Sequence, residues 1–518
     1  NIKKNDPDSF YALNELSNDA ISSNKITEVK NVCQKMKDLY GENITTRYLD
    51  SWLASKQDKQ EEHIAIAKAN YEKYPFRYGY MNAMFSIEEY TLKNTKAATA
   101  IVEDYCSKYF NASAMETLSG RYIKDGDTEK GLKILEERID IMPYASGYMY
   151  NYANTLYRMQ RYQEALDVTE RILALAPYLP GTYSLRADIY KAMKDEKKAI
   201  ENYKKSIYYN PAFFESRTQL RQLEDKREID ELFPRFSLDS LIAEAPGADK
   251  YPNDPSLIVL YDTKLMFHPE GATEYHAELA VKILNQSGIE IWKEYSIPYY
   301  GNQQLTLDKS EIRKVNGQKV KAETNGNNHI VFTNLEVGDV LYLEYRIKDY
   351  STDILSKHFY DQYVFRFSMP TMITSYSILA PKDKKFQYMV SNGKIDAAIS
   401  EVEGMKLYRW VLQHQEAIKI EPYMSPLIDI APTLTFSSIP DWQFIGNWYR
   451  DLTANKFKDD YLLKEIVDEI LKGKENASQL EKAKLFYEYI LKNITYSNVP
   501  FMQNNFIPQK ASRTLSTR

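Results

Sequence analysis

The feature that most constrains the fold of this chain is a 34-residue spacing between three prolines, Pro143, Pro177 and Pro211. Self-similarity at a fixed period of this size predicts a stack of repeated supersecondary units. We therefore expect residues 1–225 to form a helical repeat array, because this segment is rich in helix formers with amphipathic spacing. Stepping back by the same interval gives the remaining anchors: Tyr109, Pro75, Gly41 and Pro7.

Small residues recur 12 positions before the anchors, as Ala97, Gly131, Ala165 and Ala199 do. Two helices of a repeat must approach closely at such positions. Ala153 and Ala187 supply a second close approach in the same frame. The pattern resembles the tetratricopeptide repeat, in which small residues, a bulky residue and a closing proline recur over 34 positions. The resemblance is strongest over 146–213, and over 10–145 several positions depart from it, as His63, Gly131 and Tyr109 do.

The resemblance implies a superhelix with a concave surface that binds proteins or peptides. In that family the groove is lined by the first helix of each repeat. Any one residue of such a helix face could equally well be an ordinary solvent-exposed position. Carried over to the two best-matching repeats, the partner-binding residues are Tyr150, Asn154, Arg158, Asp188 and Lys191.

The helical register ends near residue 225, and a charge-rich run followed by Ala245-Pro246-Gly247 indicates a linker over 226–250. From Tyr251 the apolar residues alternate with polar ones, as in Val340 to Ile347, which is typical of strands. The dipeptides Asn316-Gly317 and Asn392-Gly393 tolerate the positive φ angles of tight hairpin turns. We expect an antiparallel β-sandwich over 251–435.

Two motifs of the strand-rich region carry a second resemblance. Tyr295 to Tyr300 reads YSIPYY, and Leu335 to Tyr345 reads LEVGDVLYLEY, with a glycine-aspartate turn before a strand. Together with the Asn316-Gly317 turn, they resemble the bacterial domain of previously unknown function that precedes transglutaminase-like cores. The resemblance covers roughly residues 255–435.

The helical period returns after Trp442, and residues 436–518 resemble the opening of a transglutaminase-like core. One apolar face runs from Leu462 to Leu471, and Ser478 with Glu481 forms a capping-box signal for a second helix. That helix leads into the segment Lys492 to Tyr496, and Pro508, Ala511 and Leu515 follow in the order typical of the family.

The catalytic residues of that family do not occur in this segment. The resemblance implies a nucleophilic cysteine, a histidine and an aspartate that would lie beyond Arg518. Cys33 and Cys106 belong to the helical array, and no histidine follows His414. We interpret both cysteines as core fillers and nominate no catalytic residue, so the chain as given is not expected to be an enzyme.

Other partners and cofactors have little support in the sequence. The six histidines form no HExxH pattern, and glycine-rich phosphate loops are absent, so neither a metal nor a nucleotide cofactor is expected. A net charge of -5 with interleaved signs argues against nucleic acid. No apolar run approaches the roughly 20 residues of a membrane-spanning helix.

These observations give a multidomain α+β fold: an N-terminal tetratricopeptide-like α-solenoid, a central antiparallel β-sandwich and the helical start of a transglutaminase-like domain. The expected function is a protein- or peptide-binding scaffold without cofactors. The alternative is a fragment of a transglutaminase-like cysteine enzyme acting as peptidase, amidase or acyl transferase. The family resemblance implies export to the periplasm or outer envelope of a bacterium, in an envelope complex. Asn1 reads as a processed or truncated start.

Overall fold

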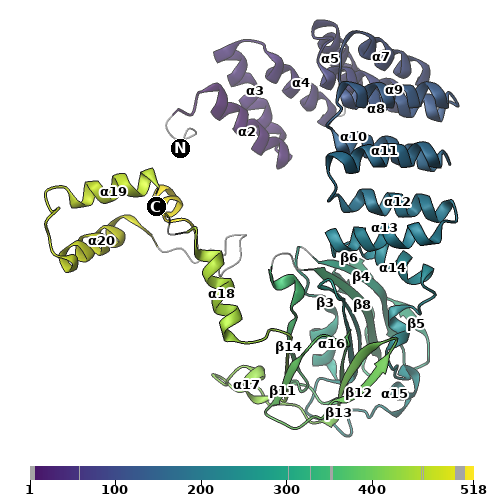
Figure 1. Ribbon diagram of the computed structural model, residues 1–518, viewed down its shortest axis with the longest axis vertical. Coiled ribbons are helices and arrows are strands. Elements are labelled where there is room, and N and C mark those ends of the chain that lie inside the picture. Colours follow the sequence, from purple (N-terminus) through teal and green to yellow (C-terminus); the bar gives the residue numbers. More distant parts are fainter. Residues whose placement is uncertain are drawn as a thin grey trace. The chain divides into compact units, whose positions relative to one another are not determined.

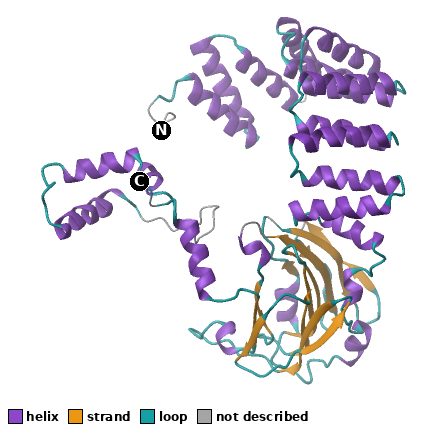
Figure 2. Cartoon of the chain, viewed as in Figure 1, coloured by secondary structure: helices purple, strands orange, loops and turns teal. Residues whose placement is uncertain are grey.

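The computed structural model describes residues 6–57, 59–301, 303–326, 328–350, 354–456, 458, 460–495 and 508–517. It divides into two compact units, Asn1–Lys205 and Ser206–Arg518. The first unit is helical and the second contains the sheets (Figures 1 and 2). No helix among these residues is long and apolar enough to cross a lipid bilayer.

The helices between residues 10 and 223 confirm the 34-residue repeat, and the last of them belongs to the second unit. The first helices of successive pairs start three residues after each anchor, and successive starts are 34 residues apart from Phe10 to Phe214. The helices are α2 (Phe10–Ser22), α3 (Ile26–Tyr40), α4 (Ile44–Lys56), α5 (Gln60–Lys73), α6 (Tyr78–Ser86), α7 (Thr95–Lys108), α8 (Ala112–Lys124), α9 (Thr128–Ile141), α10 (Ser146–Arg158), α11 (Tyr162–Leu175), α12 (Pro180–Ala192), α13 (Glu196–Tyr209) and α14 (Phe214–Leu223).

The small residues lie where the two helices of a pair pack together. Ala165 and Ala199 are fully buried. Gly131 of α9 lies so close to α8 that a Cβ there would be 2.8 Å from the carbonyl oxygen of Ser119. Ala97 is the exception, because a π-helical turn, η1 (Ile87–Thr91), adds a residue before α7. Ala98 consequently takes the buried position.

The second unit is built on an eight-stranded sheet in the order β12-β13-β10-β1-β2-β8-β4-β5. Two three-stranded sheets, β11-β14-β9 and β3-β7-β6, accompany it. The strands are β1 (Ser256–Phe267), β2 (Ala272–Ile283), β3 (Glu294–Ser296), β4 (Gln304–Arg313), β5 (Lys319–Lys321), β6 (Glu323–Asn325), β7 (His329–Val331), β8 (Val340–Tyr350), β9 (Tyr360–Val364), β10 (Thr371–Pro381), β11 (Gln387–Ser391), β12 (Ala398–Val402), β13 (Met405–Gln415) and β14 (Thr433–Ser437).

The large sheet is mixed, which corrects the purely antiparallel expectation. Strands β1 and β10 pair in parallel, with Ile258 opposite Thr371. Alternation along a strand reports which face is buried and carries no information on the direction of its neighbour. The Asn316-Gly317 turn joins β4 to β5 as a hairpin, as predicted. Asn392-Gly393 instead connects β11 and β12, which lie in different sheets.

Residues 226–250, expected to be a linker, pack on the large sheet. They contain the 3-10 helix η2 (Ile229–Leu232) and α15 (Leu238–Glu244). Leu232 and Phe233 are buried against Met266, Leu379 and Leu407 of the sheet. The linker was predicted from the many charged residues of this segment, which do not reveal the apolar contacts of Leu232 and Phe233. The sheet unit also includes α16 (Gln286–Trp292), the 3-10 helix η3 (Ile354–Lys357) and α17 (Leu427–Ile430).

The C-terminal helices are α18 (Trp442–Thr453), α19 (Tyr461–Leu471), α20 (Gln479–Asn493) and α21 (Ala511–Thr517). The predicted capping box is present, because Ser478 and Glu481 satisfy each other's backbone N–H groups. Tyr496 and Arg518 lie outside the described residues. The apolar stripe of α20 stays largely exposed: Leu480 is 68% and Leu491 65% exposed.

Candidate functional site

The five predicted partner-binding residues lie on two successive first helices, Tyr150, Asn154 and Arg158 on α10 and Asp188 and Lys191 on α12. Arg158 and Lys191 are exposed, and the other three are half-buried. The side chains of Arg158 and Asn154 make no hydrogen bond or ion pair with any residue that the structure describes. Their donor groups are therefore free to bind a partner.

Asp188 lies close to the tyrosines of the preceding first helix. Burial and the Asp188 carboxylate raise the pKa of both Tyr150 and Tyr157. The Tyr203 hydroxyl of α13 donates to Asp188 Oδ1 at 2.5 Å. The structure thus brings Tyr150 and Asp188 together. Tyr157 was missed in the sequence, although it lies 34 residues before Lys191 and so occupies the equivalent position.

Cations recur at the last residue of three first helices. Lys56 ends α4, Lys124 ends α8 and Arg158 ends α10, and all three occupy the same position of the 34-residue frame. The partial negative charge at a helix C-terminus favours cations there. Within the described parts of the chain none of the three has a carboxylate partner. We call these residues the cation row.

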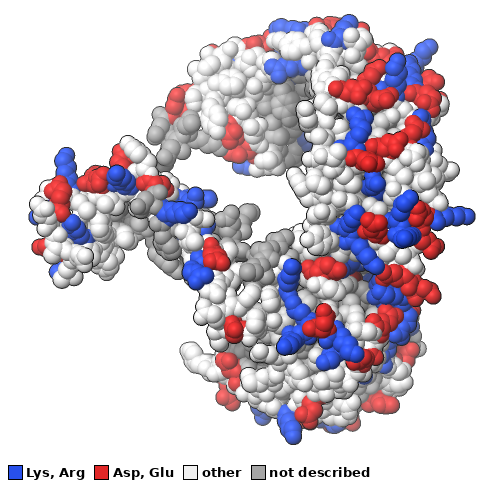
Figure 3. Space-filling view, in the orientation of Figure 1, with Lys and Arg blue, Asp and Glu red and all other residues white. Residues whose placement is uncertain are grey.

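The rest of the helical surface carries both signs of charge. Basic and acidic side chains are interspersed over α9–α13 in the view of Figure 3. Several of these charges are paired, such as Arg161 with Glu164 at 2.6 Å. The cation row is distinguished from other exposed cations of the unit by its recurrence at one position of the 34-residue frame.

Neither cysteine has the environment of a nucleophile. Burial and the nearby Asp50 carboxylate raise the pKa of Cys33 to about 12. Burial alone raises the pKa of Cys106 to about 11. Reactive cysteines instead have a lowered pKa and a neighbouring cation or base. Both thiols are held in the protonated, unreactive form.

We expect iodoacetamide at pH 8 to alkylate both thiols of the native protein more than about 100-fold slower than those of the urea-unfolded protein. The raised pKa lowers the thiolate fraction, and burial limits access. Mass spectrometry of quenched samples measures the two rates. Alkylation of Cys33 at the unfolded rate in native protein would contradict the buried environment.

His276 fixes the segment 226–250 to the sheet through charge. Its Nδ1 lies 3.1 Å from Asp230 of η2 and its Nε2 3.3 Å from Glu344 of β8. Neither contact is well aligned as a hydrogen bond, so the attraction is mainly between charges. Burial opposes the imidazolium, but the two carboxylates outweigh it and raise the pKa to about 9. His276 is therefore charged at neutral pH.

This pairing predicts a pH-dependent stability. The pKa of His276 is higher in the folded than in the unfolded protein, so its protonation stabilises the fold. This stabilisation is complete below the unfolded pKa of 6.5 and is lost as the pH rises through about 9. We expect His276→Gln to remove about 3 kcal/mol at pH 6 and almost nothing at pH 10. Urea unfolding at both pH values measures the difference. An equal loss at pH 6 and pH 10 would show that the charge does not contribute.

Comparison with known proteins identifies one domain. Residues 325–419 match DUF3857, described as a domain of unknown function with a solved structure. The match covers β7 to β13 and agrees with the resemblance of the strand-rich region. No curated protein matches the chain.

Several solved structures match parts of this chain at low sequence identity. A crystal structure from Parabacteroides distasonis, named as a suspected protease, has 17% identity and a TM-score of 0.42 over 51% of this chain. This chain spans 55% of the length of that protein. MamA from Desulfovibrio magneticus has 16% identity and a TM-score of 0.24, covering 28% of this chain and 82% of its own.

The first tetratricopeptide domain of RPAP3, solved with an HSP90 peptide, has 21% identity and a TM-score of 0.20, covering 22% of this chain and 90% of its own. The human RPAP3 domain matches to the same extent. The assignment of residues 10–209 as tetratricopeptide-like rests on the 34-residue helix pairs of this chain.

Proposed function

We propose that the helical unit binds a protein or peptide segment along its first helices, through Tyr150, Asn154, Arg158, Asp188 and Lys191. The observation that carries this proposal is the cation row. Lys56, Lys124 and Arg158 recur at one position of the repeat and lack carboxylate partners among the described residues. An acidic segment that runs across successive helix pairs would supply the missing charges.

Selection from a random peptide library on the full chain tests this function. We expect enrichment of sequences with several acidic residues. The double variant Lys124→Glu with Arg158→Glu should lose these sequences, because both exposed cations become repulsive. Lys197→Glu is the matched control, since Lys197 is exposed on a second helix. Selected peptides without an acidic excess, or equal losses in variant and control, would contradict the proposal.

We also propose that residues 436–518 are the opening of a transglutaminase-like domain, with a cysteine, a histidine and an aspartate farther along the complete protein. An apolar groove of about 340 Å³ supports this, because uncovered apolar surface of this kind is typically an interaction site. It is lined by side chains of α19, α20 and α21, including Ile466, Phe486 and Leu515.

The intact mass of the protein purified from its source tests this second proposal. A mass above the 60.5 kDa of this chain is expected, together with a thiol beyond residue 518 that reacts with iodoacetamide. A mass of 60.5 kDa would remove catalysis from the account. Export to a bacterial envelope remains part of the proposal, and cell fractionation followed by immunoblotting tests it.

A further inference from the structure

The large sheet has an open edge along the first half of β4. On one side β4 pairs with β8 from Gln304 to Arg313. On the other side β5 pairs only with Glu311, Ile312 and Arg313, and the Ala322 amide donates to the Ser310 carbonyl at 2.9 Å. Residues 304–309 have no strand partner on this side within the described parts of the chain. Such an edge presents unpaired backbone groups to any extended segment.

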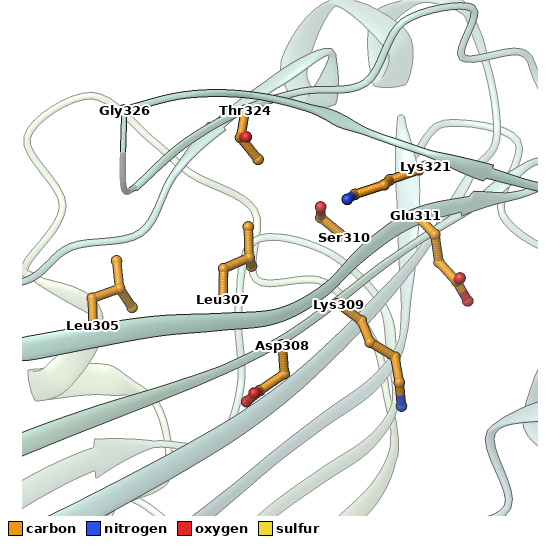
Figure 4. A pocket seen from close by; sticks show the side chains of 9 residues that line it. All are labelled: Leu305, Leu307, Asp308, Lys309, Ser310, Glu311, Lys321, Thr324 and Gly326. Carbon is orange, nitrogen blue, oxygen red and sulfur yellow. The ribbon is translucent and has the colours of Figure 1, made fainter. Parts of the chain in front are cut away.

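A cleft of about 550 Å³ lies beside this edge. It opens because the chain leaves the large sheet after Lys321 and enters β6, which is the edge strand of the three-stranded sheet β3-β7-β6. Its lining includes residues of β4 together with Lys321, Thr324 and Gly326 (Figure 4). We call it the β4 cleft. Its volume falls within the range of ligand-binding pockets.

A β-bulge decides which side chains face the β4 cleft. The register of β4 against β8 shifts between Leu307 and Lys309, so Asp308 is the extra residue. Leu307 lies opposite Tyr345 and Ser310 opposite Leu343, which places Leu305, Leu307 and Ser310 on one face. Figure 4 shows these three side chains directed into the cleft and Asp308, Lys309 and Glu311 directed away.

One end of the β4 cleft is apolar. Leu305 and Leu307 pack against the core but remain half-exposed, whereas Ile312 of the same face is fully buried. An apolar side chain placed over the two leucines would bury them further. Removing apolar surface from water is favourable, so the two leucines favour an apolar occupant.

The other end of the β4 cleft is cationic. Lys321 is exposed and has no ion-pair partner within the described chain. It lies opposite Glu311 in the pairing of β4 with β5, and in the view of Figure 4 its long side chain runs toward Ser310. Ser310 is only 6% exposed, and its hydroxyl has no hydrogen-bond partner in the described residues. Thr324 adds a second hydroxyl from the opposite wall. An exposed ammonium without a carboxylate partner fits an anionic oxygen ligand.

We propose that the β4 cleft binds an extended peptide segment that adds as a strand to the edge of β4, with apolar side chains over Leu305 and Leu307 and a carboxylate at Lys321. Main-chain hydrogen bonds to the edge supply affinity in this mode, and pockets for alternate side chains supply specificity. Six residues of β4, 304–309, span about 20 Å, so a peptide of about six residues fills the edge. The carboxylate comes from an acidic side chain or from a chain end.

Fluorescence anisotropy on the full chain tests the site with three labelled peptides of alternating valine and threonine. One ends in a free carboxylate, one in a glutamate with an amidated end, and one in a neutral amide. We expect at least one carboxylate peptide to bind about fivefold tighter than the neutral amide, and Lys321→Ala to remove that advantage. A free-end preference identifies a chain terminus as the ligand, and a glutamate preference identifies an acidic side chain.

Lys319→Ala is the matched control, because Lys319 is an exposed lysine of β5 that does not line the β4 cleft. It should change affinity less than twofold. Equal binding of all three peptides, equal losses in the two variants, or no binding of any peptide at 1 mM would overturn the proposal.

Hydrogen exchange tests the strand addition itself. With the tighter peptide bound, amides within 304–309 should exchange more slowly, because the peptide covers this edge. Amides of β12, the opposite edge of the sheet, should not change. Binding without slower exchange at 304–309 would place the peptide elsewhere.

Discussion

Replacing Lys264 with methionine should destabilise the sheet unit by about 3–5 kcal/mol. Lys264 is 2% exposed on β1, and its ammonium lies 3.1 Å from Asp262 and 2.6 Å from Glu278. These carboxylates outweigh the effect of burial and raise the pKa of Lys264. Without the ammonium, Asp262 is left buried without its cation. Urea unfolding followed by tryptophan fluorescence measures the loss, since Trp292, Trp410, Trp442 and Trp448 all lie in this unit.

Lys309→Met is the control for this prediction. Lys309 also pairs with a carboxylate, Glu344, at 2.7 Å, but its side chain is 57% exposed. An exposed pair of this kind contributes at most about 1 kcal/mol. A double variant, Lys264→Met with Asp262→Leu, should recover part of the loss because no unpaired Asp262 charge remains. Equal effects of Lys264→Met and Lys309→Met would show that burial of the charges does not matter.

Replacing Trp410 with alanine should cost about 3–5 kcal/mol by leaving a cavity between two sheets. Trp410 is fully buried on β13 of the large sheet. Its ring lies 5.8 Å from Phe436 of β14 and 5.3 Å from Tyr388 of β11, both in the neighbouring three-stranded sheet. The indole therefore joins the two layers. Urea unfolding followed by far-ultraviolet circular dichroism measures the loss without relying on the deleted indole.

Trp442→Ala provides the comparison, because this indole on α18 is 88% exposed. An exposed substitution of this kind should stay within about 0.5 kcal/mol of the wild type. If Trp410→Ala lowered the free energy of unfolding by no more than Trp442→Ala does, the inference that Trp410 packs between the two sheets would be wrong.

The repeat frame was predictable because helix pairs repeat their packing constraints at fixed intervals. The anchor Pro177 and the small residue Ala165 report the end of one pair and the close approach of its helices. The frame failed at Ala97, since a π-helical turn adds a residue without a clear sequence signal. The direction of β10 could not be predicted either, because strand pairing depends on residues distant in sequence.

The candidate site was predictable in position but not in its charge pairing. The spacing placed Arg158 on a first helix, while only the structure shows that it lacks a carboxylate partner among the described residues. Tyr203 lies on a second helix and reaches Asp188 through a long side chain. The 34-residue spacing assigns residues to helix faces and does not predict hydrogen bonds between side chains of different helices. The β4 cleft depends on the bulge at Asp308, which alternation alone does not reveal.

Site-specific photocrosslinking tests the central claim, that the first helices of the repeats bind a partner. A photoreactive amino acid at position 154 of α10 should crosslink the full chain to one discrete partner in extracts of its source. The same probe at position 197 of α13 should not, and adding Lys124→Glu and Arg158→Glu should abolish the product at position 154. Equal crosslinking from both positions, or a product that survives the charge reversal, would contradict the account.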